Sequence, residues 1–425
     1  MTSFLFAVGA GFIVALGLIG YALWAKETLD PSLFRGLLVY GGVVAVTQWA
    51  NAQLVSLRAT LQFAFLARFS VVTALLSAVL NVAAVNVVGF DGLLVATLVV
   101  AMVSAGVYTH VAGNPLRHVD VASLRTTFPS SAKSMLVMGL PLLVMASVHS
   151  VLHTIDNVMA LKLLGTEWLG RYTLALSGGA VLYSFANSVT MVLYPHMQVA
   201  YGKERTPGAL APFVEKPVKM LAAGLPLLIA PLFFGLPVLA RGLLPKFVPG
   251  IPAFQCLVVG ISFYALAQLP HLSLLSLNKI PQIVAWTVTT AGVAVAASFA
   301  LTTAGFGLVG IAMAITFAYL IFFAGLLLYA MSFWTTRRSS LALLGRACLT
   351  VAFAASLLVL VDHVPLPAPL GFLTDIVVGV ARVAIFIAVY LPILMVSDRE
   401  TGLLREHLYP RVRRLREQSS RRRSV

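Results

Sequence analysis

Five ionisable residues gather in one otherwise apolar stretch, "HTIDNVMALKLLGTEWLGRYTLA". They are His153, Asp156, Lys162, Glu167 and Arg171. An arginine can bind a phosphate through two parallel hydrogen bonds, and a lysine attracts it as a compact positive charge. His153 and Asp156 are three residues apart and therefore share one face of a helix. The stretch could bind an anionic, hydrated group inside an apolar protein.

Two interpretations of this stretch remain open. In the first, Lys162 and Arg171 form an anion-attracting rim at the outer mouth of a cavity, with His153 and Asp156 deeper inside. In the second, Lys162, Glu167 and Arg171 are solvated loop charges, which we favour for these three. His153 and Asp156 would then form a structural hydrogen bond or ion pair, since charged groups within a membrane span usually face protein or water.

Two further polar residues are candidates for substrate binding. Arg382 lies about ten residues into the last apolar run, where it could meet a phosphate in a groove, snorkel to the interface or pair with Asp375. We favour a structural role for it. Asn187 could line a cavity or form a hydrogen bond between helices, and the second is commoner in helical bundles.

The composition identifies the protein as an integral membrane protein. Of its 425 residues, 60% are hydrophobic and only 10% are charged, and the mean hydropathy is +0.96. An ordinary soluble domain has about 25% charged residues, so these charges cannot cover a surface that faces water. The net charge of +15 comes from basic residues between apolar runs and at the C-terminus. This pattern is typical of membrane topology and not of nucleic-acid binding.

Twelve apolar runs are long enough to span a membrane as helices of roughly 17–25 residues. The expected fold is therefore all-α and polytopic. The runs cover residues 2–24, 36–57, 69–88, 92–113, 137–161, 172–196, 218–240, 254–277, 283–303, 310–334, 341–361 and 372–396.

The distribution of basic residues predicts the orientation. With twelve spans both termini lie on one side, and that side carries 22 of the 29 lysines and arginines, nine of them in the tail. The other side carries six, and Arg382 falls inside a span. Because basic loops stay on the cytoplasmic side, we expect both termini in the cytoplasm.

The sequence gives no sign of an enzyme, a metal site or a cofactor. Cys256 and Cys348 both lie in apolar runs, without a CxxC or zinc spacing. There is no HExxH or DxD motif, and the outside loops are too short for a catalytic domain. A membrane glycosyltransferase, polymerase or ligase is therefore disfavoured.

An internal repeat relates the two halves of the chain. "VGFDGLLVATLVVAM" (residues 88–102) resembles "AGFGLVGIAMAITFA" (residues 304–318), and "SLRATLQF" resembles "SLNKIPQI" upstream. Aligning Gly92 with Gly310 gives an offset of 218, which superimposes four consecutive spans on four later ones. We expect two repeated bundles in the same membrane orientation.

The repeat also predicts a domain organisation. The spans at 137–161 and 172–196 have no counterpart after Met1, so we expect the first bundle to lack a helical hairpin. The expected divisions are a first bundle (1–116), a cytoplasmic linker (117–136), a six-helix second bundle (137–336), a C-terminal helix pair (337–398) and a basic cytoplasmic tail (399–425).

Several stretches resemble the polysaccharide and O-antigen (Wzx-type) flippases of the multidrug/oligosaccharidyl-lipid/polysaccharide exporter superfamily. "MGLPLLVMASVHSVLHTIDNVMALKLLGTEWLGRYTLA" is similar to the opening of the second bundle in that family, with Pro141 entering the helix and Gly165, Gly170 and Tyr172 marking the turn. "VLYPHMQ", "LLPKFVPGIPAFQCLVVG" and "LRATLQF" resemble later helix ends and loops. The expected lack of the first hairpin is a departure from that family.

The resemblance implies transport of a polyprenyl-diphosphate-linked oligosaccharide across the bacterial cytoplasmic (inner) membrane by alternating access. Membrane lipid is an expected partner, and a polysaccharide polymerase or another assembly protein is a further one. Nucleic acid is not an expected partner. The alternatives are a peptidoglycan-precursor flippase and a cation-coupled multidrug exporter. The second would need a carboxylate deep in a span, whereas Asp91 of the first bundle lies in a turn.

Overall fold

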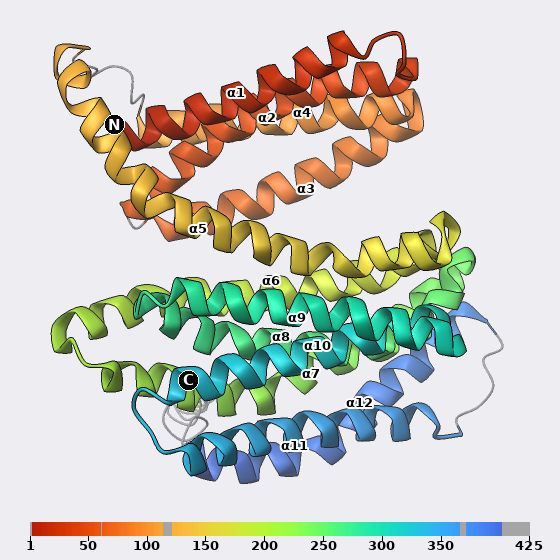
Figure 1. Cartoon of the computed structure of the whole chain (residues 1–425). Coiled ribbons are helices and arrows are strands. Elements are labelled where there is room, and N and C mark those ends of the chain that lie inside the picture. Colours follow the sequence, from red (N-terminus) through yellow and green to blue (C-terminus); the bar gives the residue numbers. More distant parts are fainter. Residues whose placement is uncertain (1, 61, 114–120, 366–370, 402–425) are drawn as a thin grey trace, which may run out of the picture. The chain divides into compact units, whose positions relative to one another are not determined.

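The computed structural model describes residues 2–60, 62–113, 121–365 and 371–401, and these residues form helices without strands (Figure 1). The predicted all-α fold is confirmed. Each of the twelve apolar runs falls on its own helix. The helices are α1 (Thr2–Trp24), α2 (Pro31–Ala59), α3 (Phe63–Val88), α4 (Phe90–Ala112), α5 (Val121–Leu164), α6 (Thr166–Glu204), α7 (Ala211–Leu243), α8 (Ile251–Ser276), α9 (Ile280–Leu301), α10 (Gly307–Met331), α11 (Arg337–Asp362) and α12 (Phe372–Thr401).

Length and composition allow these helices to cross a membrane. Eleven described segments are long and apolar enough, and one of them, Ile280–Met331, contains both α9 and α10. The two helices are joined by the short π-helix η4 (Thr302–Phe306), where Gly305 has a φ of 90°. The protein is thus a polytopic membrane protein, with α9 and α10 forming one continuous helical hairpin.

The chain divides into two compact units, Met1–Leu140 and Pro141–Val425. The boundary falls inside α5, which begins at Val121. Residues 121–136 of the expected linker are therefore helical, because the helix of the fifth span continues backward through them. Residues 117–120 of that linker, and residues 402–425 of the expected tail, lie outside the described residues.

The helix bounds bear out the internal repeat. Shifted by 218, α4 would cover residues 308–330, and α10 covers Gly307–Met331. The packing partners also agree, since α2 packs on α1 and α4 whereas α8 packs on α7 and α10. Gly89 (φ 73°, ψ −142°) and Gly307 (φ 53°, ψ −131°) occupy equivalent turns. A positive φ favours glycine because it has no Cβ.

The core of the second unit is built around α8 and α10. Phe254 and Leu266 of α8 and Phe322, Phe323 and Leu326 of α10 are fully buried. The two helices approach closely at Gly260, where a Cβ would lie 2.4 Å from Thr316 Oγ1 and 2.8 Å from its Cα. A small residue at such a crossing lets two helix backbones pack directly against each other. The C-terminal helices α11 and α12 pack on α7.

Large apolar side chains remain on the outer faces of the helices. On α3, for example, Val72, Leu75, Val79 and Val82 are 57–66% exposed. A stripe of this size is unfavourable in water but suits a helix surrounded by lipid tails.

Substitution of Gly260 by alanine tests the α8–α10 crossing. The new methyl group must displace Thr316 or separate the helices, which costs about 1–3 kcal/mol of stability for an overpacked core site. We expect a clearly lower melting temperature for the Gly260→Ala protein in detergent. Gly292→Ala on α9 is the control, because nothing lies within 4 Å of the added Cβ. Equal melting temperatures for the two variants would contradict the close crossing.

Candidate functional site

Asp156 is a buried carboxylate that joins α5 to α6. Its side chain lies in the core, with the residue 4% exposed. Oδ1 accepts a hydrogen bond from the backbone N–H of Asn157 at 2.8 Å, and Oδ2 accepts one from the Tyr172 hydroxyl at 3.4 Å. Because Tyr172 on α6 is itself fully buried, this contact lies between the two helices and not at their surface.

His153 does not pair with Asp156, although the two share a helix face. Its Nε2 lies 2.7 Å from the hydroxyl of Tyr264 on α8. The Nε2 of His149, one turn earlier on α5, lies at the same distance from the same hydroxyl. The two imidazole rings meet edge to face, with centroids 4.9 Å apart. Tyr264 therefore bridges two histidines of the neighbouring helix.

More rings of the second unit surround this bridge. The Tyr183 ring of α6 stands edge to face against His153 and Tyr264, with centroids 5.1 and 5.0 Å away. His271 of α8 packs against His149 at 5.6 Å. We call His149, His153, Tyr183, Tyr264 and His271 the histidine–tyrosine cluster.

Several polar atoms at the cluster are buried without a hydrogen-bond partner from the described protein. They are the Nδ1 atoms of His149 and His271 and the Nε2 atom of Gln268. His271 and Gln268 are only 7% and 8% exposed. Since buried polar atoms in proteins are nearly always satisfied, such atoms need a functional or structural explanation.

The α5–α6 turn positions the two basic candidates. Gly165, with a φ of 92°, ends α5, and α6 begins at Thr166. Glu167 and Trp168 therefore lie in the first helical turn of α6 and not in a loop, because Gly165 alone connects the two helices. Lys162 is exposed in the last turn of α5.

Arg171 is held by side chains of its own helix. Its guanidinium forms an ion pair with Glu167, four residues earlier, and lies 4.6 Å from the centre of the Trp168 ring. The Glu167 side chain is 76% exposed and that of Arg171 is 27% exposed. Exposed pairs of this kind contribute little to stability, so an anion of higher charge could take the place of Glu167.

A second connection approaches the same end of α6. A Cβ on Gly250 would lie 2.3 Å from the Arg171 carbonyl oxygen, so the short helix η3 (Pro245–Gly250) packs directly on α6. Lys246 belongs to η3, and Arg241 lies in the last turn of α7 just before it. Basic residues from two connections thus occur at one end of the second unit.

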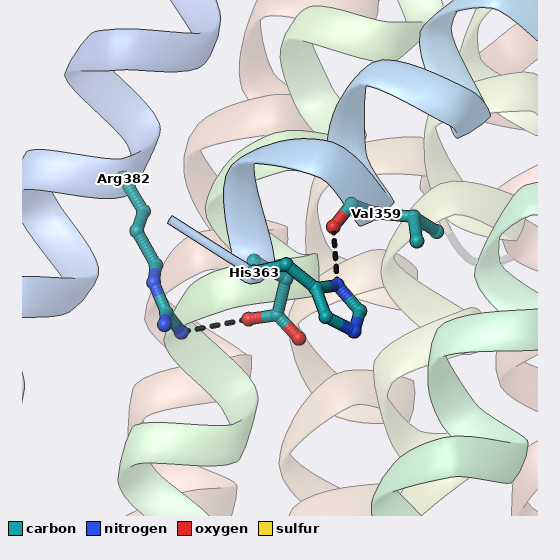
Figure 2. A network of polar contacts seen from close by, with 4 residues as sticks. Val359, His363 and Arg382 are labelled. Carbon is teal, nitrogen blue, oxygen red and sulfur yellow. Dashed lines mark hydrogen bonds and ion pairs between the residues drawn. The ribbon is translucent and has the colours of Figure 1, made fainter. Parts of the chain in front are cut away.

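Arg382 forms an ion pair with Asp362, the last residue of α11, and not with Asp375 (Figure 2). Its Nη1 donates to Asp362 Oδ1 at 2.7 Å. The two side chains are 21% and 32% exposed. Beside them, Nδ1 of His363 lies 2.8 Å from the Val359 carbonyl oxygen. Arg382 thus joins α12 to α11.

The six sequence candidates do not form one site. His153 and Asp156 face the interior between α5, α6 and α8. Lys162 and Arg171 lie near the α5–α6 turn, and Arg382 pairs with Asp362. Asn187 is exposed on α6, where its backbone carbonyl accepts a hydrogen bond from the Thr190 hydroxyl.

Residues that sequence reasoning missed complete the interior cluster. His149 lies four residues before His153, and His271 lies seven after Tyr264, so each pair shares a helix face. This spacing of polar rings within apolar runs could have identified the cluster from the sequence. No group of three His, Cys, Asp or Glu side chains among the described residues is arranged to hold a metal ion.

Two comparisons relate the chain to known proteins. The family model described as "polysaccharide biosynthesis protein" matches residues 1–250. The fold is similar to that of the lipid II flippase MurJ in an inward closed conformation. That solved structure is 12% identical and has a TM-score of 0.63, and the match covers 93% of this chain and 85% of that one. No curated protein matches the chain in sequence.

A double-mutant cycle tests the Arg382–Asp362 contact. Arg382→Leu leaves the Asp362 charge without its partner, and Asp362→Leu does the same to Arg382. The double variant removes both charges and should recover part of the lost stability. We expect a coupling of about 0.5–3 kcal/mol between the two residues, measured from the unfolding of all four proteins in detergent. Additive losses would show that the ion pair contributes nothing.

Proposed function

The chain belongs to the polysaccharide biosynthesis protein family, and we propose that it is a flippase for a lipid-diphosphate-linked oligosaccharide. The family match over residues 1–250 is the observation that carries this proposal. The fold likeness to a flippase structure supports it, because both chains share one helical architecture. In the proposed reaction the sugar diphosphate crosses the membrane through the protein while the lipid tail remains in the bilayer.

Charge placement in the second unit fits such a cargo. A sugar diphosphate is anionic and hydrated, so its passage through an apolar protein requires cations and polar groups. Lys162 and Arg171 lie near the α5–α6 turn, whereas Arg241 and Lys246 come from α7 and η3. We propose Arg171 and Lys162 as substrate contacts at this end. We propose no direct substrate contact for His153 and Asp156, because their side chains bond to Tyr264 and Tyr172 within the second unit.

We also propose a location and an orientation. The cytoplasmic membrane of a bacterium is where lipid-linked oligosaccharides are moved outward for polysaccharide synthesis. The 22 basic residues on the side of the termini support a cytoplasmic location for both termini. In this orientation the α5–α6 turn faces outward, so its basic residues would meet the head group as it leaves.

Two rival functions differ in their cargo. A peptidoglycan-precursor flippase would move a lipid-linked disaccharide peptide. A cation-coupled drug exporter would need an embedded carboxylate, and Asp156, at 4% exposure, is one. The exporter would carry a soluble cationic molecule and not a lipid-linked anion.

Transport by purified protein distinguishes these functions. The full chain is reconstituted in vesicles of bacterial phospholipid that contain a fluorescent polyprenyl-diphosphate-linked oligosaccharide. A quencher that cannot cross the membrane then reports how much label reaches the outer leaflet. We expect faster loss of protected label than in protein-free vesicles, and little movement of lipid II or a cationic dye. Preferential movement of lipid II or of the dye would replace the proposed cargo.

Substitutions at Arg171 test the proposed diphosphate contact. Lysine keeps the charge but loses the two-pronged geometry, and glutamine loses both. We expect transport to fall in the order wild type, Arg171→Lys, Arg171→Gln, with equal protein in the vesicles. Glu167→Gln is the matched control, because it breaks the same ion pair but leaves the arginine free for substrate. If Glu167→Gln impairs transport as much as Arg171→Gln, the ion pair is structural. Wild-type transport by Arg171→Gln would also contradict the contact.

A further inference from the structure

Two histidines share one tyrosine hydroxyl inside the second unit. Nε2 of His149 and Nε2 of His153 both lie 2.7 Å from the Tyr264 hydroxyl oxygen. This is the normal length of a hydrogen bond to a hydroxyl group. The two histidines are four residues apart and share one face of α5, whereas the tyrosine belongs to α8. The contact therefore joins two helices of the same unit.

The chemistry of the hydroxyl restricts the protons on the two rings. A phenol has one hydrogen to donate and lone pairs to accept with. Tyr264 can therefore donate to at most one imidazole, and the other must donate its own Nε2–H to the phenol oxygen. The two rings then exist as different tautomers, one with hydrogen on Nε2 and one with hydrogen on Nδ1.

We propose that His149, Tyr264 and His153 form a proton relay along α5. Three observations carry the proposal: both histidines share one hydroxyl, the Tyr264 side chain that carries it is buried, and His149 Nδ1 is buried without a hydrogen-bond partner among the described residues. Histidine chains embedded in membrane proteins commonly carry protons.

The relay is balanced as follows. His149 starts with hydrogen on Nε2, and Tyr264 donates to Nε2 of His153. A proton that binds at Nδ1 of His149 makes an imidazolium. The Nε2–H proton of His149 then moves to the phenol oxygen, while the phenol proton moves to Nε2 of His153. Tyr264 remains neutral, His149 is neutral with hydrogen on Nδ1, and His153 carries the positive charge.

Several titratable groups of the same unit surround the relay. On α5, Asp156 lies one turn beyond His153. From α6 come the hydroxyls of Tyr172 and Tyr183, and Tyr319 of α10 bonds to Tyr183 at 2.6 Å. On α8, His271 packs on His149. Asp156 is the one acidic residue among these groups, so its carboxylate would stabilise a charge on His153 more than one on His149.

The relay itself does not depend on the cargo, but its use in driving transport rests on the proposed function. A proton bound on one side of the relay and released on the other would make transport respond to a pH gradient. A merely structural cluster would keep fixed tautomers and would not respond.

Nitrogen NMR of the full chain, labelled on histidine and embedded in lipid bilayers, tests the relay without substrate. His149→Gln and His153→Gln assign the two rings. We expect opposite neutral tautomers in the wild type and, on acidification, a charge shared by the pair. His153→Gln should then shift the signals of His149.

Tyr264→Phe keeps the ring and removes only the bridging hydroxyl. In this background, substitution of His153 should no longer change which nitrogen of His149 carries the hydrogen, because the direct ring contact transmits no proton. Tyr183→Phe is the matched control, since its hydroxyl bonds to Tyr319 and not to a histidine, and the coupling should persist. Identical tautomers on both rings, or coupling that survives in Tyr264→Phe, would overturn the relay.

Transport in the oligosaccharide-lipid vesicles then tests its use. An imposed pH gradient should accelerate wild-type and Tyr183→Phe transport, and Tyr264→Phe should lose that acceleration while retaining transport without a gradient. Equal acceleration in Tyr264→Phe would show that the relay does not drive transport. If wild-type protein moves no lipid, the proposed function fails, and the NMR result still decides the relay.

Discussion

Polar side chains in this protein must find their partners within the protein, because lipid offers none. Asp156 accepts a hydrogen bond from Tyr172 of α6, and Nη1 of Arg382 donates to Asp362 of α11. Trp49 of α2 donates to Thr109 of α4 at 2.8 Å in the first unit. Each contact joins two helices, so satisfying a polar group also fixes a helix pair. At the histidine–tyrosine cluster, by contrast, buried polar atoms of His149 and His271 have no hydrogen-bond partner among the described residues.

The internal repeat gives the two units similar helix packing but different chemistry. The offset of 218 sets Gln53 against His271, and both are buried polar residues on equivalent helices. It sets Val46 against Tyr264 and Ala101 against Tyr319. The described part of the first unit therefore has no hydroxyl where the second has its bridging phenol. The shared architecture serves packing, and the proton chemistry is a property of the second unit.

The sequence predicted the helices well because spanning a bilayer demands a long apolar run, which is visible without any tertiary information. The repeat was equally visible, since aligning Gly92 with Gly310 superimposes four consecutive apolar runs on four later ones. The partners of the polar side chains were not visible in the sequence. His153 and Asp156 share a helix face, which suggested a pair, but the three-dimensional neighbours are Tyr264 and Tyr172. Sequence spacing shows which residues share a face, whereas helix crossing decides what that face meets.

The same limit explains Arg382, whose partner lies twenty residues earlier on another helix and not seven residues away on its own. It also explains Arg171, which the sequence predicted either as part of an anion-attracting rim or as a solvated loop charge. The structure gives it a competing carboxylate and an aromatic ring. This arrangement would let Arg171 exchange Glu167 for a diphosphate, because an exposed ion pair is weak and a diphosphate carries more charge than Glu167.

The histidine–tyrosine cluster lies on the packed face of α5, so its protonation affects how this helix packs. On α5, Leu152 and Ile155 are buried, whereas Leu143 and Val151 are more than half exposed, so only one face of the helix holds it to α6 and α8. The Tyr264 bridge belongs to that face. A positive charge on either ring changes which atoms can donate across the α5–α8 contact, and therefore changes the stability of that contact. Because a ligand shifts a conformational equilibrium only by its differential affinity for the two states, a proton bound here could favour one arrangement of α5 over another.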